Sequence, residues 1–108
     1  MDKAIADYTK AIELNPQLVE AYYNRGRAWD SKNDFDRAIS DYSQVLAINP
    51  RFDETYFNRA RAFYQTGSIE NAITDAKKAL ILNPDDKDYQ QMVGFLEKQA
   101  DEDKVKQQ

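Results

Sequence analysis

The side chains of this 108-residue chain that could do chemistry recur 34 residues apart. The repeated polar groups are amides, guanidinium groups and carboxylates, which form hydrogen bonds and ion pairs. They are Asn24 and Asn58, Arg25 and Arg59, Arg27 and Arg61, and the aspartates Asp7, Asp41 and Asp75. Groups of these types favour recognition of a partner and pairing within the fold.

The sequence contains no cysteine and no histidine. Thiol nucleophiles, Cys/His metal sites and every mechanism that uses imidazole as a general base are therefore excluded. Carboxylates are plentiful, but they recur at the spacing of a solvated helix surface. The sequence also lacks a glycine-rich phosphate loop and an acidic loop of the EF-hand kind. We therefore expect no enzyme activity, no cofactor and no metal site.

Composition and charge narrow the class of protein further. Hydrophobic residues make up 42% and aromatic residues 12%, which indicates a folded chain, and only three glycines and three prolines favour helices over a β-sandwich. The formal net charge of -4 works against nucleic acid as a partner. No apolar run approaches the roughly 18 residues of a membrane span. We expect a soluble, cytoplasmic protein that does not enter a membrane.

The three prolines, at positions 16, 50 and 84, mark a repeat of 34 residues. Segment 19–52 matches segment 53–86 at 12 of 34 positions without a gap, and residues 1–18 match 35–52 at 7 positions. The chain is therefore interpreted as a half repeat at 1–18, whole repeats at 19–52 and 53–86, and a divergent capping helix and tail at 87–108.

Each whole repeat is predicted to form two amphipathic helices. In the first repeat, apolar or small residues recur at intervals of three, four and seven over 19–31 and again over 35–48. The Asn-Pro pair ends the second helix, because proline disfavours helical geometry in the residue before it. A small residue such as Gly26 lets two helix axes approach, and Trp29 is expected to close the gap above it.

These positions resemble the tetratricopeptide repeat (TPR) family, whose pattern has an early aromatic residue, small residues in both helices and a closing proline. The pattern is filled by Tyr22, Gly26, Trp29, Ala38, Tyr42 and Pro50 in one repeat and by Tyr56, Ala60, Phe63, Ala72 and Pro84 in the next. The resemblance covers residues 1–86 and implies an all-α, right-handed superhelix of antiparallel helix pairs, with about six helices. Over 87–100, an apolar stripe that includes Tyr89 and Leu96 predicts a C-terminal capping helix.

The resemblance also implies a concave groove, lined by first-helix residues that are not used in packing. The residues expected to bind a partner there are Tyr23, Asn24, Arg27, Phe57, Asn58, Arg61 and Tyr64. The two asparagines would hold the backbone of an extended peptide, since a primary amide both donates and accepts. The rings would supply apolar contact, and the arginines would pair with acidic groups. The predicted function is that of an adaptor that binds a peptide of another protein.

Other readings of the same groove stay open. Each groove arginine follows an aromatic residue by four positions, so its guanidinium could rest on the ring of its own helix. The arginines and rings could also form a stacking track for RNA, against which the acidic Glu20 and Glu54 argue. The best-known TPR clamp holds the C-terminal carboxylates of large chaperones with lysine, asparagine and arginine. In this chain, the positions where that clamp has lysine hold Tyr23, Glu54 or Asp88, depending on the register of the alignment. That specific clamp is therefore not expected.

The remaining repeated charges are expected to form semi-buried ion pairs between adjacent helices. The arginines Arg25 and Arg59 lie between packing positions, and the aspartates lie in the second helices. The predicted pairs are Arg25 with Asp7 or Asp41, and Arg59 with Asp41 or Asp75.

Residues 1–18 supply only the second helix of a repeat, and two consequences are open. In one, the chain is a fragment of a longer array and this helix serves as its cap. In the other, an apolar edge that carries Ile5, Tyr8 and Ile12 packs against a second copy and forms a homodimer. The second case is the architectural alternative to peptide binding.

Overall fold

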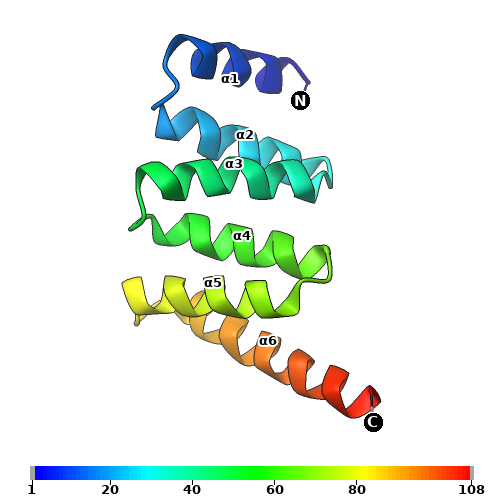
Figure 1. The fold of residues 1–108 in the computed structure, drawn as a ribbon. Helices are drawn as coiled ribbons and strands as arrows, with labels where there is room; N and C mark the ends of the chain where they lie inside the picture. The colour runs from blue at the N-terminus through cyan, green and yellow to red at the C-terminus, as the bar shows by residue number, and fades with distance from the viewer. Residues whose placement is uncertain (1, 108) are drawn as a thin grey trace.

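The computed structural model describes residues 2–107, except for the side chain of residue 2, and every regular element among them is a helix. Figure 1 shows the helices stacked one after another in chain order, with the two termini at opposite ends. The Cα radius of gyration, 14.8 Å, exceeds the roughly 13 Å of a compact globule of this length. The predicted all-α stack is confirmed, and it is elongated. The helices are α1 (Asp2–Leu14), α2 (Val19–Ser31), α3 (Phe35–Ile48), α4 (Asp53–Gln65), α5 (Ile69–Leu82) and α6 (Lys87–Lys106).

The turn between the two helices of each pair contains a residue in the left-handed region. These residues are Asn33 (φ 61°) and Gly67 (φ 84°), at equivalent positions of the two repeats. Glycine adopts this conformation without a steric cost, and asparagine tolerates it better than most residues do. Asp34 then caps α3 by accepting a hydrogen bond of 3.3 Å from the backbone N–H three residues on. Between the repeats, Asn49 Oδ1 accepts from the N–H two residues on at 3.2 Å, which folds the Asn-Pro turn.

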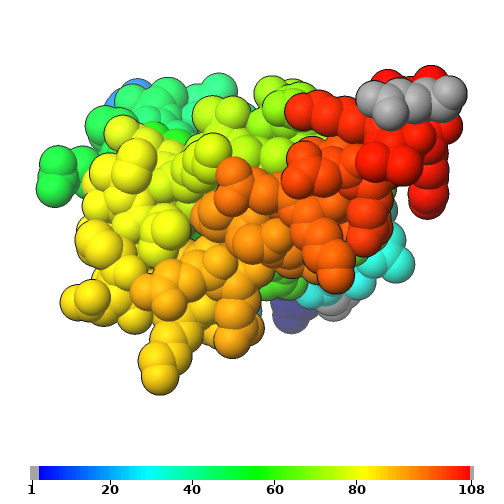
Figure 2. All heavy atoms as spheres, turned by 90° about the horizontal axis from the view of Figure 1, so that it is seen from below, coloured from blue at the N-terminus to red at the C-terminus, as the bar shows by residue number. Residues whose placement is uncertain are grey.

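Small buried residues dominate the core between the helix pairs. The cluster shared by α4, α5 and α6 consists of Ala60, Ala72, Ala76 and Leu96, all fully buried. Alanines allow the helices to approach closely, and the leucine of α6 fills the remaining space. Figure 2, seen from the C-terminal end of the stack, shows α6 lying across α5. The last helix therefore covers the apolar face that the second repeat would otherwise expose.

Tyr42 of α3 fills the gap beside Gly26 of α2. A Cβ atom at Gly26 would lie 2.7 Å from Tyr42 Cε1, so the ring packs directly on the backbone of α2. The Tyr42 side chain is fully buried. Trp29 lies instead against Arg37, whose Cζ is 4.9 Å from the centre of the indole ring. The ring nearest to Gly26 is therefore the phenol of Tyr42, which reaches the glycine from the facing helix, and not the indole of Trp29.

Arg25 joins three consecutive helices through one guanidinium group. Its Nε and Nη2 bind the two carboxylate oxygens of Asp41 on α3, at 2.8 and 2.7 Å. Its Nη1 donates to Thr9 Oγ1 of α1 at 3.1 Å. The pairing of Arg25 with Asp7 is therefore not formed: Asp7 is exposed and makes no ion pair with a described residue.

The second repeat has the same arrangement. Arg59 of α4 binds both oxygens of Asp75 on α5, at 2.7 and 2.8 Å, and donates to Ser43 Oγ of α3 at 3.1 Å. Each arginine therefore pairs within its own repeat and reaches the preceding repeat through a hydroxyl. At the last interface α6 has a valine in place of the arginine, and an exposed ion pair of 3.3 Å between Lys77 and Glu97 joins α5 to α6 instead.

The large apolar residues at the surface are scattered. Ile5, Tyr8 and Ile12 of α1 are half-buried, so the predicted edge offers less apolar surface than expected. Leu14 and Ile81 are 79% and 71% exposed at separate places on the stack. Within the described part of the chain, no helix combines the length and the apolar character needed to cross a membrane.

Thr55 of α4 is fully buried, and its Oγ1 has no hydrogen-bond partner among the described residues. A buried hydroxyl without a partner costs about 1–3 kcal/mol. Thr55→Val keeps the β-branched shape and removes the hydroxyl, so we expect the free energy of unfolding in urea to rise by about 1 kcal/mol. Thr74→Val, at an exposed helix position, is the matched control and should shift it by less than about 0.5 kcal/mol. A less stable Thr55→Val variant would contradict this account.

Candidate functional site

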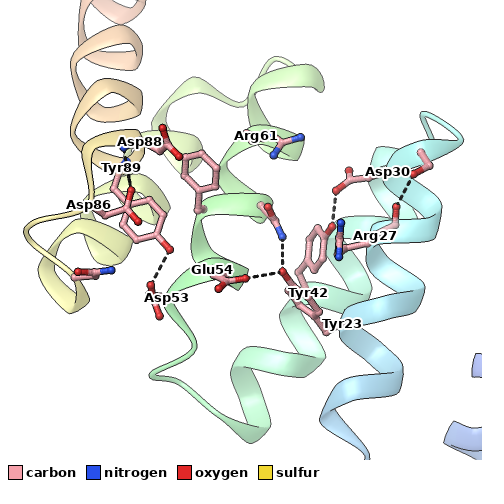
Figure 3. A pocket seen from close by; sticks show the side chains of 14 residues that line it. Tyr23, Arg27, Asp30, Tyr42, Asp53, Glu54, Arg61, Asp86, Asp88 and Tyr89 are labelled. Carbon is pink, nitrogen blue, oxygen red and sulfur yellow. Dashed lines mark hydrogen bonds between the residues drawn. The ribbon is translucent and has the colours of Figure 1, made fainter.

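A groove of about 530 Å³ opens between α2, α4 and the start of α6. The repeat sets the first helices of successive pairs near one another, so that residues about one period apart in the sequence meet here. α3 contributes one ring to the lining, and the turn before α6 contributes polar groups, as Figure 3 shows. Five carboxylates and two guanidinium groups line the groove.

Asn58 connects α4 to α2 across the groove. Its Nδ2 donates to Tyr23 Oη at 3.1 Å, and Tyr23 Oη donates to Glu54 Oε2 at 3.2 Å (Figure 3). The first bond orients the amide of Asn58, and the second holds the phenol that accepts it. No described residue donates to Asn58 Oδ1, so the amide keeps an unused acceptor and an unused N–H.

Aromatic rings stiffen both ends of the groove. Tyr23 stacks on Phe52 with ring centres 4.9 Å apart and an angle of 20° between the planes. Phe57 meets Tyr89 of α6 at 5.1 Å and 38°. Tyr89 Oη also donates to Asp53 Oδ2 at 2.7 Å, which ties α6 to the first turn of α4. Such ring pairs add about 0.5–1.5 kcal/mol beyond the area that they bury.

Two phenols of the groove are held in the protonated form. Burial raises the pKa of Tyr42, and the hydrogen bond that it donates to Asp30 raises it further. Burial and the hydrogen bond to Asp53 likewise raise the pKa of Tyr89. Both hydroxyls are therefore hydrogen-bond donors with fixed acceptors at neutral pH, and neither can act as a base.

Arg27 and Arg61 are exposed, and each lies over an aromatic ring one turn earlier on its own helix. The Cζ atoms are 6.0 Å from the ring centre of Tyr23 and 5.8 Å from that of Phe57. Burial raises the pKa of Asp30, while a hydrogen bond and the positive charges of both arginines oppose that rise. Both guanidinium groups thus act on one carboxylate of the groove, which balances part of their charge.

A second, more apolar cavity of about 320 Å³ adjoins the groove and shares Asp30 and Arg61 with it. Its apolar lining includes Tyr64 of α4 and two side chains of α6, Met92 and Phe95. The ring of Tyr64 meets that of Phe95 edge-on, with centres 5.3 Å apart and planes at 74°. The two cavities therefore form neighbouring parts of one face.

Comparison with known families decides the identity of the fold. Models of the tetratricopeptide repeat match residues 19–52 and 53–86, and a TPR repeat model matches residues 1–29. The chain belongs to the tetratricopeptide repeat family. No curated protein sequence matches this TPR chain significantly.

Solved TPR structures share its fold. The first TPR of Spaghetti (RPAP3) bound to HSP90 peptide SRMEEVD is 25% identical, with a TM-score of 0.88 over 92% of this chain and 79% of that chain. The Arabidopsis OM64 TPR domain is 29% identical, with a TM-score of 0.85 over 90% of this chain and 80% of that chain. MamA from Desulfovibrio magneticus RS-1 is 24% identical, with a TM-score of 0.87; the match covers 96% of this chain and 59% of that chain, and it shows the fold alone.

The TPR stack brings most of the sequence-predicted groove residues together. Tyr64 lies apart from the main groove and lines the second cavity. Asn24 does not line the groove, although it is equivalent to Asn58 in the repeat. Asn58 donates to the phenol of Tyr23, whereas no hydrogen bond joins Asn24 to a phenol within the described part of the chain. The predicted residues that do line the groove are Tyr23, Arg27, Phe57, Asn58 and Arg61.

Reasoning from the sequence missed the part of the groove that surrounds α6. The missed lining residues are Asp53, Asn83, Asp86 and Tyr89. The prediction for 87–100 was a cap, and Tyr89 was assigned to its apolar stripe. One feature of the sequence could have revealed this part of the groove. Asp88 follows Glu54 by one repeat period, so the position that is acidic in the first helix of each repeat is also acidic in α6.

Proposed function

We propose that this chain is a protein-interaction module that binds an extended segment of a partner protein in the groove between α2, α4 and α6. The observation that carries the proposal is the amide of Asn58, which Tyr23 holds in place with an acceptor and an N–H unused. An amide in this state can donate to one backbone carbonyl of a peptide and accept from one backbone N–H, whatever the side chains of the peptide.

The family supports the same role. The RPAP3 domain, which shares the fold of this chain, has been solved with a peptide of HSP90. A shared fold by itself does not fix a function, so the proposal rests on the groove residues of this chain. The rigid aromatic rings of the groove suit it to binding a partner, because ordering these rings costs little conformational entropy. A groove made by two first helices and the start of a third is small, and we expect affinities of about 1 μM or weaker.

The alternative roles have less support. Self-association through Ile5, Tyr8 and Ile12 would bury little additional apolar surface, because all three are already half-buried. Binding of RNA in the groove would bring phosphates towards five carboxylates. A catalytic role would need a phenol that can give up its proton, but Tyr42 and Tyr89 are held as donors, and burial raises the pKa of the third groove phenol, Tyr23, as well. We therefore propose a binding function and no catalytic one.

Asn58→Ala is expected to weaken the binding of peptide ligands about tenfold. Two hydrogen bonds of about 0.7 kcal/mol each are lost, and about 1.4 kcal/mol corresponds to a factor of ten. Ligands would be selected on a peptide array with the wild-type chain and then titrated by fluorescence anisotropy. Asn24→Ala is the matched control, because it removes the same amide at the equivalent repeat position outside the groove. Its affinities should equal those of the wild type.

Two results would contradict the proposal. One is that Asn58→Ala and Asn24→Ala leave every selected ligand equally well bound. The other is that the wild-type chain retains no peptide but captures single-stranded RNA in a salt-sensitive way, which would favour the nucleic-acid alternative. Sedimentation over a range of concentrations tests the homodimer separately.

A further inference from the structure

We propose that the groove selects segments that carry basic side chains close to an apolar one, and that it discriminates against acidic peptides. This inference names the ligand class of the groove and rests on the proposed function. Two independent features carry it: the distribution of charge along the groove, and an exposed phenylalanine where the groove meets its neighbouring cavities.

Four of the five groove carboxylates lie on one side, formed by the first turn of α4 and the start of α6 (Figure 3). Their hydrogen bonds come from neutral donors: a phenol on Asp53, another on Glu54, and two backbone N–H groups on Asp86. None of the four forms an ion pair within the described part of the chain. Neutral donors orient a carboxylate but leave its charge in place, so this side of the groove stays negative. The four are Asp53, Glu54, Asp86 and Asp88.

The positive charges on the opposite side of the groove, along α2 and the later turns of α4, do not neutralise these four carboxylates. The cations of that side are Arg27 and Arg61, which lie over rings of their own helices and both act on Asp30. An acidic ligand group at this side meets two cations and one anion, whereas a basic group at the α6 side meets four anions. Charge complementarity therefore favours lysine or arginine in the bound segment, and it places that residue beside the start of α6.

Phe95 supplies the apolar part of the recognition surface. Its side chain is 47% exposed, and it lines both the second cavity and a third cavity of about 280 Å³. Phe57 and Asp88 line this third cavity and the main groove alike, so the exposed ring is continuous with the negative side. In α2 and α4 the equivalent repeat position holds Arg27 and Arg61. The repeat position that is basic in α2 and α4 is thus apolar in α6. A leucine or methionine of the ligand would pack against the Phe95 ring there.

The same geometry disfavours an acidic peptide. The HSP90 peptide in the RPAP3 structure, SRMEEVD, contains three acidic residues. In this chain Glu54 and Asp88 would face such residues across the groove. Like charges brought together at an interface cost binding free energy and suppress the wrong partner.

The test uses three labelled peptides of equal length with blocked ends and the cores Lys-Lys-Leu-Lys-Lys, Glu-Glu-Leu-Glu-Glu and Lys-Lys-Ser-Lys-Lys. Fluorescence anisotropy with the full chain measures each dissociation constant in about 0.05 M and about 0.3 M salt. We expect the first peptide to bind at least about tenfold more tightly than the second at low salt, and about fivefold more tightly than the third. The higher salt concentration should reduce the difference in affinity between the basic and the acidic peptide more than the difference between the leucine and the serine peptide.

Glu54→Gln/Asp88→Asn removes two of the negative charges and should weaken the basic peptide about fivefold to tenfold. Asp36→Asn/Glu102→Gln is the control, because it changes the net charge equally at two exposed positions outside the groove. This control separates recognition in the groove from general attraction between a basic peptide and an acidic protein. Circular dichroism of both variants checks that the helices are retained.

The outcomes separate the ligand class from the proposed function. Equal or tighter binding of the acidic peptide, lost in Asn58→Ala, would overturn the basic preference and leave the groove as a peptide site. An equal loss in both double variants would overturn the assignment of the charge effect to the groove. Failure of the chain to bind any peptide, including every sequence on an array, would overturn the proposed function and this inference together.

Discussion

Tyr42→Ala should lower the free energy of unfolding by about 3–5 kcal/mol, the cost of removing a large buried ring. The ring is fully buried and packs on the backbone of Gly26, where no side chain of α2 can take its place. Truncation therefore leaves a cavity between α2 and α3. Because single domains are stable by only about 5–15 kcal/mol, a large part of the total stability is lost.

The effect of Gly26→Ala should change sign with the residue at position 42. In the wild type, the new Cβ would lie 2.7 Å from a ring that cannot move away, at a cost of about 1–3 kcal/mol. In the Tyr42→Ala background the ring is gone, and the helix propensity of alanine over glycine raises stability by up to about 1 kcal/mol. The second repeat contains this combination naturally, with Ala60 and Ala76 at the equivalent positions.

Urea unfolding followed by circular dichroism gives the four free energies of this double-mutant cycle. Tyr42→Phe is the control for the hydroxyl, because it removes only the hydrogen bond to Asp30 and should cost about 1 kcal/mol. If Gly26→Ala were destabilising to the same extent in both backgrounds, close packing of the ring on the glycine would not be what couples the two helices.

The helices could be predicted from the sequence because their signals are local. The apolar spacing over 19–31 and 35–48 and the Asn-Pro pairs mark where helices begin and end without reference to distant residues. Packing against Gly26 could not be predicted in the same way. Trp29 and Tyr42 are both large residues of the repeat pattern, and only the crossing of α2 over α3 decides which ring reaches the glycine.

The groove could be predicted only as far as the repeat is regular. Asn58 and Asn24 have the same register, yet of the two only Asn58 lines the groove and bonds a phenol in the described part of the chain, so sequence equivalence overstated the amide ladder. The acidic side depends on α6, where the repeat motif is lost and no family position points to Asp86 or Tyr89. Its negative charge arises from two segments that meet in space, the first turn of α4 and the start of α6, which a pattern along one helix does not contain.

Asp75→Ala should lower the free energy of unfolding by about 3–5 kcal/mol, because it leaves the guanidinium of Arg59, most of which is shielded from water, without its counter-charge. The side chains are 5% and 21% exposed, and two hydrogen bonds of 2.7 and 2.8 Å join them. Asp41→Ala should have a similar effect in the first repeat, where Arg25 has the same environment. An unchanged melting temperature for either variant would contradict a structural role for the pair. Lys77→Ala is the control: it breaks an ion pair that is 53% and 51% exposed and should cost less than about 1 kcal/mol.

The double variant Arg59→Met/Asp75→Leu tests whether this ion pair contributes to the stability of the fold or fixes how the two repeats pack on each other. When both charges are replaced by apolar groups, no charge is left without its partner. The free energy of unfolding should therefore fall by less than it does in Asp75→Ala alone. The same guanidinium also donates to Ser43 on the preceding repeat, and that bond disappears in the double variant. If the arginine fixes the angle between repeats, hydrogen exchange should quicken at the interface of α3 and α4 although global stability is largely kept. Since the groove is built by helices on both sides of that interface, peptide affinity should fall with it, which links the buried ion pairs to binding.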